Sequence, residues 1–147
     1  MKPPLIVPDE NVFVSGTTIS TTPPAQIMRA WRDDKIQVAT SKPILESLEK
    51  VLRYERVRKF TNMSDFEINN YIGYVRASAF VVPGTTKVNI SPDPDDNKLF
   101  SCAIEAEADY IVSGDKKDVL SVMEFQGVKT ISPRDFVSKV LKRTKDT

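Results

Sequence analysis

The sequence predicts an α/β fold: an α/β/α sandwich with a central parallel sheet and right-handed crossovers. Short apolar runs of strand length alternate with segments of helical period along the chain. Near the middle of the second half, a helical segment leads directly into the buried run at 110–112, a succession typical of βαβ units. A length of 147 residues suits a single domain over 1–147, and an apolar content of 40% can fill its core.

The first part of the chain is expected to contain three strands and three helices. Pro8 has no backbone donor, so it is expected at the last position of the first strand. Pro43 suits the first turn of a helix that Thr40 or Ser41 can cap, and a capping box begins at Ser64. The expected elements are strands at 5–8, 36–39 and 80–82, helices at 24 to about 33, 43–52 and 65–78, and a loop at 15–23.

The remaining part is expected to place a helix between a loop and a strand. Leu99, Phe100 and Ala103 recur at helical intervals, so this helix buries one face. Ser132 followed by Pro133 is a typical helix start. The expected elements are a loop at 83–92, strands at 110–112 and 128–131, a short helix at 116–125, a last helix from 133, and a frayed, solvated basic tail at 139–145.

The composition excludes several classes of catalytic site. With 21 basic and 20 acidic residues the formal charge is +1, which gives no overall bias toward nucleic acid or membrane. No histidine is present, which excludes Ser-His-Asp and Cys-His catalysis and His-ligated metals. Cys102 is the single cysteine, so no internal disulfide or thiolate zinc cluster can form, and it is expected as a small core residue. No apolar run has the length of a signal peptide or a membrane span, so a soluble cytoplasmic protein without a membrane partner is expected.

Four acids are expected at one edge of the sheet. Asp9 and Asp115 directly follow strands. Asp96 falls in the first turn of a helix, and Glu46 lies one turn into the helix that follows another strand. If these strands are neighbours, the carboxylates converge on the edge where open α/β folds build their sites. Like charges within about 4 to 6 Å raise each other's pKa, so such a cluster must take up protons or bind a cation. Oxygen ligands without His or Cys favour Mg²⁺ or Mn²⁺, which predicts metal-dependent phosphodiester hydrolysis.

Each acid also has an ordinary structural interpretation. Short acidic side chains after strands are often only turn formers or helix caps, and acids suit the first turn of a helix. Only the joint pattern favours a site. The ordinary roles are turn or cap for Asp9 and Asp115, first-turn acid for Asp96, loop or capping group for Asp93 and Asp95, and solvated helix residue for Glu46.

Three stretches of the chain resemble the signatures of the PIN domain family. Residues 6–12 resemble an apolar strand followed by Asp-Thr-Asn-Val. Asp-Pro-Asp-Asp at 93–96 and the run at 108–115 resemble the second signature, which ends in Ala-Asp-Tyr-Ile-Val-Thr-Gly-Asp, with Ser113 in place of threonine. Residues 132–136 resemble the third, Thr-Pro-x-x-Phe. The second signature is the specific one, and the resemblance covers nearly the whole chain, in particular to toxin components of toxin–antitoxin systems.

The resemblance implies a PIN-like fold and a ribonuclease dependent on Mg²⁺ or Mn²⁺, acting as the toxin of a toxin–antitoxin pair. The implied partners are an RNA substrate, a protein antitoxin and, by family analogy, a second copy of the chain in a homodimer. Together with the acid pattern, the resemblance implies that Asp9, Asp96 and Asp115 bind the metal and that the same three residues and Glu46 are catalytic. It implies that Asn11 and Ser113 orient the acids.

Two positions depart from the family pattern. Ser47 stands where the family has a helical glutamate, and Glu46 lies one residue earlier, about 100° away around the helix. Glu10 replaces the usual threonine. These departures leave open a catalytically silent module that binds RNA or a protein partner. The metal chemistry alone also leaves open a small phosphatase or a flap-type DNA nuclease.

Several basic residues are candidates for gripping RNA phosphates near the acids. A solvated surface charge remains the alternative for each of them. Tyr54, which lies among them, can stack on a base or fill a core or interface position. The candidates are Arg53, Arg56, Arg58, Lys59, Lys116 and Lys117.

Overall fold

The centre of the fold is a mixed sheet, seen in a computed structural model that describes residues 2–18 and 20–142. Its strands are β1 (Leu5–Pro8), β2 (Gln37–Ser41), β3 (Phe80–Val82), β4 (Tyr110–Val112), β5 (Glu124–Phe125) and β6 (Val128–Ile131). They lie in the order β3-β2-β1-β4-β6-β5. All neighbours are parallel except β5, which runs antiparallel to β6. The predicted α/β class is confirmed, and the expectation of a parallel sheet is corrected at this one edge.

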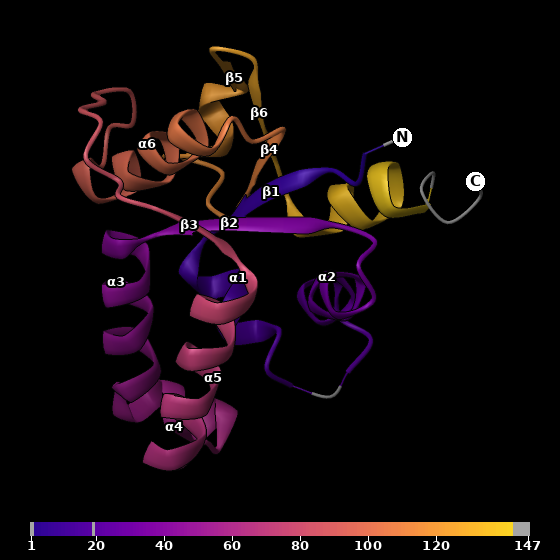
Figure 1. The fold of residues 1–147 in the computed structure, drawn as a ribbon, viewed down its shortest axis with the longest axis vertical. Helices are drawn as coiled ribbons and strands as arrows, with labels where there is room; N and C mark the ends of the chain where they lie inside the picture. Colours follow the sequence, from indigo (N-terminus) through magenta and orange to yellow (C-terminus); the bar gives the residue numbers. More distant parts are fainter. Residues whose placement is uncertain (1, 19, 143–147) are drawn as a thin grey trace.

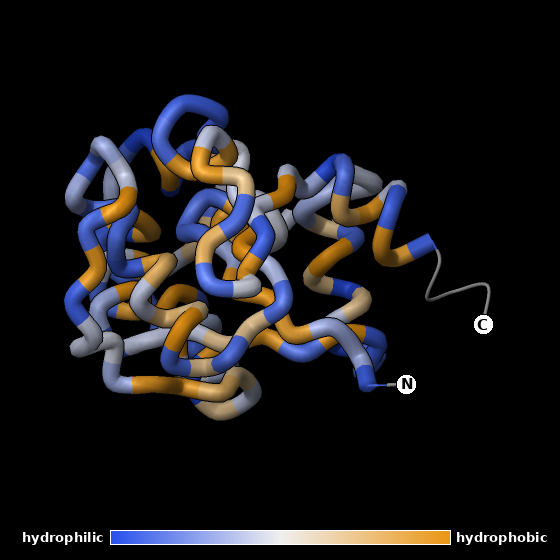
Figure 2. Tube along the Cα trace, turned by 90° about the horizontal axis from the view of Figure 1, so that it is seen from above, coloured by the Kyte–Doolittle hydropathy of each residue, from blue (hydrophilic) through white to orange (hydrophobic). Residues whose placement is uncertain are grey.

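Helices cover both faces of the sheet, as predicted. They are α1 (Glu10–Ser15), α2 (Pro23–Arg32), α3 (Lys42–Arg53), α4 (Glu55–Thr61), α5 (Asp65–Ser78), α6 (Asn97–Ala106) and α7 (Pro133–Asp135), which continues as a π-helix (Phe136–Leu141). Figure 1 shows α1, α2, α3 and α5 on one face and α6 on the other. Because neighbouring residues of a strand point to opposite faces, Ile6 packs in the first apolar cluster and Val7 in the second. Figure 2 shows the resulting alternation of hydrophobic and hydrophilic segments along the trace.

The direction of strand addition reverses between β1 and β4. The chain first adds β2 and β3 on one side of β1, and then returns to add β4 on the other side. At such a switch point the connections leave in opposite directions and a crevice opens at the carboxyl ends of the two strands. The residues that follow β1 and β4 are therefore placed in the most favourable position for a site.

Side-chain caps start three helices where the sequence predicts them. Ser41 caps α3, and Ser132 caps α7. Ser64 and Glu67 form the full capping box of α5, in which each side chain bonds to the other's backbone N–H. These local signals explain why the predicted starts of these helices are confirmed.

The predicted helix over 116–125 is wrong. A 3₁₀ turn, Leu120–Val122, leads instead into β5. Gln126 and Gly127 both have positive φ, 50° and 86°, and form the two-residue turn between β5 and β6. Val119 and Phe125 both pack on the apolar cluster beneath α6.

Other segments differ in extent from the sequence prediction. α1 and α4 occupy segments to which the pattern assigned no helix, and β2 runs to Ser41 rather than ending at 39. Of the basic tail expected at 139–145, residues up to 141 belong to the π-helix, and 143–145 lie outside the described residues. No helix in the described part of the chain has the length and apolarity that a membrane crossing requires.

Gly84 is predicted to be essential for the loop that follows β3. Its φ is +72°, and an added Cβ would lie 2.9 Å from both Pro43 Cδ and Ser41 Cβ. The Gly84→Ala variant is expected to lower the free energy of unfolding by about 3 kcal/mol, because a left-handed alanine and a close contact are both unfavourable. Urea unfolding measures this. The matched control is Gly73→Ala in α5, where an added Cβ meets no atom within 4 Å, and where alanine is expected to add about 0.5 to 1 kcal/mol. Equal midpoints for the two variants would contradict the prediction.

Candidate active site

Asp9 lies at the carboxyl end of β1 and caps α1. Its Oδ1 accepts a hydrogen bond from the backbone N–H of Val12 at 2.9 Å. Its own N–H donates to the Val112 carbonyl at the end of β4, at 3.0 Å. The Ser113 hydroxyl donates to Asp9 Oδ2 at 2.6 Å. Burial raises the pKa of Asp9, although the bonds from Ser113 and Val12 act in the opposite direction. A carboxyl group that is only 8% exposed is thus held at the switch point.

Ser113 connects Asp9 to Asp115. Besides donating to Asp9, Ser113 Oγ accepts a hydrogen bond from the backbone N–H of Asp115 at 3.1 Å. Asp115 Oδ1 in turn accepts from the backbone N–H groups of Lys117 and Asp118, at 3.1 and 2.9 Å. These contacts restrict the directions of both carboxyl groups, which is what the orienting role expected of Ser113 requires.

Asp96 lies directly before α6. It closes a 3₁₀ turn, Pro94–Asp96, directly before α6, instead of lying within the first turn of that helix. Its Oδ2 atom is buried and has no hydrogen-bond partner among the described residues. Burial, followed by the negative charges of Asp115 and Asp93, raises the pKa of Asp96 to about 7. A carboxylate in such a place gains more from a nearby cation than a solvated one.

Asp118 joins these acids although sequence reasoning did not single it out. One carboxylate oxygen each from Asp93, Asp96 and Asp118 lie within 4.8 Å of one another. The turn that Asp115 caps places Asp118 beside Asp93 and Asp96. In the sequence, the one feature that indicates this position is that Asp118 follows Asp115 by three residues. Asp93 has the capping role expected of it, since it accepts from the N–H of Asp95 at 3.0 Å, and it also belongs to the cluster.

The donor set at this edge fits a divalent cation that prefers oxygen ligands. The acids offer carboxylate oxygens, and Asp96 Oδ2 has buried lone pairs that no described residue uses. Oxygen donors of this kind favour Mg²⁺ or Mn²⁺ over softer metals. One carboxylate oxygen each from Asp93, Asp96 and Asp118 lies close enough to the others to share such an ion. Asp9 and Asp115 are not in this group of three and remain predicted ligands.

Glu10, next to Asp9, forms a half-buried ion pair. Lys98 Nζ lies 3.1 Å from Glu10 Oε2, and their side chains are 21% and 18% exposed. The Ser47 hydroxyl donates to the same Glu10 oxygen at 2.8 Å, and Lys98 Nζ donates to Ser47 Oγ at 3.3 Å. This contact joins α1, α3 and α6 beside the acids. Sequence reasoning noted Glu10 and Ser47 as separate departures and missed Lys98, because nothing in the sequence indicates that the three residues meet.

Two predicted site residues are not drawn into this network. Glu46 is exposed on α3, and Asn11 is exposed on α1. Within the described residues, neither side chain forms a hydrogen bond with the acids. The neighbouring Ser47, rather than Glu46, faces Glu10.

The basic residues predicted to contact RNA fall in two places. Arg53 lies at the far end of α3, roughly 18 Å along the axis of this 12-residue helix from its start, and bonds to Asp65 at 2.9 Å. Arg56 lies beyond it on α4. Lys116 and Lys117 are exposed beside Asp115. Only the second pair therefore lies at the edge where the acids meet.

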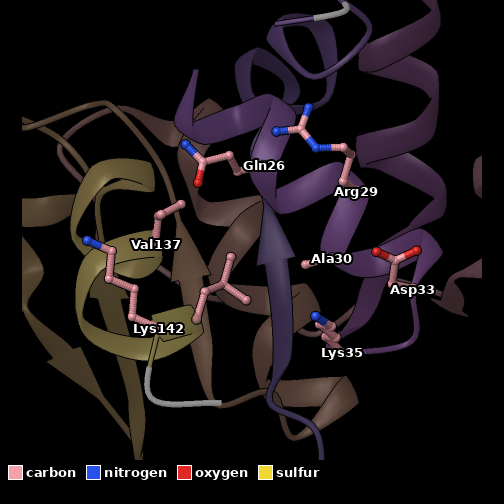
Figure 3. Close-up of a pocket in the computed structure, with 8 residues that line it drawn as sticks. Gln26, Arg29, Ala30, Asp33, Lys35, Val137 and Lys142 are labelled. Atoms are coloured by element: carbon pink, nitrogen blue, oxygen red, sulfur yellow. The ribbon is translucent and has the colours of Figure 1, made fainter. Parts of the chain in front are cut away.

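A small cavity of about 190 Å³ lies away from the acids. Figure 3 shows Arg29 and Asp33 on one side of it, and Val137 and Lys142 on the other. Its lining includes Lys35, which precedes β2, so the cavity lies near the amino end of that strand. The acids meet at the opposite edge of the sheet, and the cavity is no part of their site.

The raised pKa of Asp96 predicts how the stability of the metal-free protein depends on pH. The ordinary pKa is 3.8 and the folded value is about 7, so between these values the folded protein holds a proton that the unfolded chain has lost. The free energy of unfolding is therefore expected to fall as the pH rises from about 4 to about 7, and to level off above that. Urea unfolding in EDTA across this range measures the effect. The Asp96→Asn variant, which cannot ionise there, is expected to lose less stability, and an unchanged pH dependence would assign the titration to other groups.

Comparison with known proteins gives this arrangement a context. The chain is 26% identical over 142 residues to the uncharacterized protein MJ1680 of Methanocaldococcus jannaschii, which covers 91% of this chain and 90% of that protein. The fold of the present chain is similar to that of a chain in the crystal structure of VapBC2 from Rickettsia felis bound to a DNA fragment from their promoter. The TM-score is 0.54 and the identity 11%, and the similarity covers 87% of this chain and 98% of that one. The PIN domain of T. brucei RRP44 gives a TM-score of 0.49 at 15% identity, over 97% of this chain and 84% of that one.

The family assignment rests on the sequence. Residues 6–117 match the PIN domain family, and this range contains Asp9, Asp96 and Asp115 together with Ser113. The match covers well over half of the chain, and the α/β/α arrangement agrees with it. The chain belongs to the PIN domain family.

Proposed function

We propose that this protein is a metal-dependent ribonuclease that hydrolyses RNA phosphodiester bonds. The observation that carries the proposal is the group of acids at one edge of the sheet, where Ser113 connects Asp9 to Asp115 and the charge of Asp115 raises the pKa of Asp96. Membership of the PIN domain family supports a nuclease-type fold. A cation at this edge offsets the charge of the acids where a scissile phosphate approaches, so cleavage is expected to require the metal.

The side chains at this edge have separate tasks in the proposed reaction. Asp9, Asp96 and Asp115 would hold Mg²⁺ or Mn²⁺, which when bound activates water and offsets the charge that develops on the phosphate. The Ser113 hydroxyl donates to the carboxyl group of Asp9 and accepts from the backbone N–H of Asp115, so it fixes the direction of the first and the backbone position of the second. The pKa of Asp96, about 7, is raised because its negative charge is unfavourable in the metal-free protein, and a bound cation would stabilise that charge. Lys116 and Lys117, exposed beside Asp115, are in reach of an incoming strand, where they would contact phosphates.

We further propose that the nuclease is the toxin of a toxin–antitoxin pair, bound by a protein antitoxin and forming a homodimer. The support is the resemblance to toxin signatures and the fold similarity to VapBC2, a toxin–antitoxin complex. Induced expression in a bacterial host is expected to arrest growth, whereas the Asp96→Asn variant is expected not to. Light scattering after size exclusion tests the dimer, and a monomeric mass would exclude it.

The nuclease proposal is tested by incubating the full chain with labelled single-stranded and structured RNA. Cleavage is expected with Mg²⁺ or Mn²⁺ and is expected to stop in EDTA. A DNA of the same sequence and a phosphomonoester serve as comparison substrates, because preference for either would favour a DNA nuclease or a phosphatase. Cleavage that persists in Asp96→Asn would point to a contaminating nuclease.

A catalytically silent module is the second candidate, and the exposed position of Glu46 and the serine at 47 favour it. Calorimetry with Mn²⁺ separates the two. A nuclease is expected to show saturable heat that disappears in Asp9→Asn, whereas a silent module shows no such heat.

A further inference from the structure

A polar groove of about 560 Å³ lies between α6 and the loop that follows β3. Among the described residues that line it, none is acidic, although the acids lie close by in the chain. The groove thus differs in charge from the neighbouring carboxylates. Its polar lining includes Thr85, Thr86, Lys87, Asn97, Lys98 and Ser101.

Ser101 gives this groove the character of a binding site. The residue is 3% exposed, and its hydroxyl has no hydrogen-bond partner among the described residues. Burying a hydroxyl without a partner is unfavourable, so a ligand in the groove that accepts a hydrogen bond from Ser101 would remove this cost. A hydroxyl beside two lysines suits an anion, to which all of them can donate.

The wall of the groove formed by the loop is held rigidly against α6. Glu105 accepts hydrogen bonds from the backbone N–H groups of Gly84 and Thr86, both at 2.7 Å. Asn97 Oδ1 accepts from the N–H groups of Ile90 and Ser91, at 3.0 and 2.8 Å. Because these bonds fix the loop, this wall of the groove is preformed.

One end of the groove adjoins the carboxylates. Asn97, in its lining, directly follows Asp96. Lys98 lines the groove, and its ammonium contacts Glu10 and Ser47 beside Asp9. An ammonium group has three donors, so one remains for a ligand. A chain of phosphates lying in the groove would therefore lead directly to the acids.

We propose that this groove binds the phosphates of a single-stranded RNA substrate on one side of the cleavage site. The inference rests on the proposed RNA substrate, and it adds where the strand lies and which side chains hold it. Lys87 is exposed and forms no ion pair with any residue that the structure describes, so it is free to contact a phosphate. Ser101 would donate its unused hydrogen to a phosphate oxygen.

Binding is tested by fluorescence anisotropy of a short labelled RNA with the full chain in EDTA, where no cleavage occurs. Lys87→Gln is expected to weaken binding about threefold to tenfold at low salt, and to reduce the slope of log affinity against log salt by about 0.7, the value for one phosphate contact on a single strand. The matched control is Lys129→Gln. Lys129 is exposed on β6, where it lies opposite Tyr110 at the start of β4, away from the carboxyl ends of the strands. This variant is expected to bind RNA as the wild type does.

Ser101→Ala gives a second, independent test. It is expected to weaken RNA binding about threefold to tenfold, the effect of one hydrogen bond, and to leave the urea midpoint unchanged or raised, since it removes a buried unpaired hydroxyl. Thr40→Val is the matched control, because the Thr40 hydroxyl in β2 is also buried without a described partner but does not line the groove. It is expected to share the effect on stability without the effect on binding.

Three results would overturn the groove assignment. The first is that the wild type binds no RNA at low salt, and the second is that Ser101→Ala and Lys87→Gln bind RNA as tightly as their controls. The third is that a polyglutamate peptide binds as tightly as the RNA and loses the same affinity in the two variants. A cleavage assay on the same preparations keeps the two proposals apart. RNA that binds through the groove without being cleaved contradicts only the nuclease, whereas cleavage with unaltered binding in the variants contradicts only the groove.

Discussion

The Asp96→Asn variant is expected to lose RNA cleavage by at least about a hundredfold, and to lose Mn²⁺ binding with it. Removing an outer partner of a metal ligand typically costs tenfold to hundredfold, and Asp96 is proposed as a ligand itself. Its Oδ2 is buried and unpartnered, and its charge is opposed by Asp115 and Asp93, so a cation has more to gain here than at a solvated acid. Asparagine keeps the shape of the side chain but removes the negative charge. Initial rates with labelled RNA and calorimetry with Mn²⁺ measure the two losses.

Asp95→Asn is the matched control for this variant. It makes the same chemical change one residue away, on an exposed side chain that does not belong to the group formed by Asp93, Asp96 and Asp118. Its cleavage rate is expected to stay within about twofold of the wild type, because an exposed, solvated charge contributes little. If both variants lose the same activity, the effect comes from the net charge of the loop, and the special role of Asp96 is wrong.

The parts of the fold that the sequence predicts are those with local causes. Strands β1, β3, β4 and β6 follow from apolar runs bounded by Pro, Gly or polar residues, and the starts of α3, α5 and α7 follow from their caps. The helix expected at 116–125 is wrong because Gln126 and Gly127 turn the chain, so that the end of this segment, Glu124–Phe125, forms a hairpin with β6. The pattern records which residues are buried, and the turn decides which element buries them.

The candidate site divides in the same way. Asp9, Ser113 and Asp115 could be placed from the sequence, because each follows a strand and the strands proved to be neighbours. Asp118 reaches the acids through a turn in which its N–H donates to Asp115 and its carbonyl accepts from Ser91, and no sequence pattern indicates these contacts. The contact of Glu10 with Lys98 depends on how three helices are rotated against one another. Strand succession does not determine that rotation, so the sequence could not reveal it.

Glu10 is expected to supply the carboxylate that the family pattern places on the helix at position 47, where this chain has a serine. Glu10→Thr removes the partner of both Ser47 and Lys98, and is expected to lower RNA cleavage about tenfold to hundredfold. Ser47→Glu places a second carboxylate against Glu10 with one lysine between them, and is expected to lower the free energy of unfolding by about 1 to 3 kcal/mol. The double variant again has one carboxylate facing Lys98, so it is expected to recover most of both losses. Cleavage rates and urea unfolding of the four proteins form a double-mutant cycle, with an expected coupling of at least about 1 kcal/mol.

The competing assignment gives the role to Glu46, and the same assays separate the two. Glu46 is exposed and lies about 100° around α3 from Ser47, so Glu46→Gln is expected to change cleavage by less than about twofold, within the range of a solvated charge. The competing assignment makes two predictions. The double variant at positions 10 and 47 would show the sum of the two single losses in cleavage rate, and Glu46→Gln would lose much of the activity. Together these results would mean that Glu46 of α3 faces the metal and that the contact of Glu10 with Lys98 is only structural. Because the exchange leaves the net charge of the site unchanged, any recovery in the double variant must come from where the carboxylate lies.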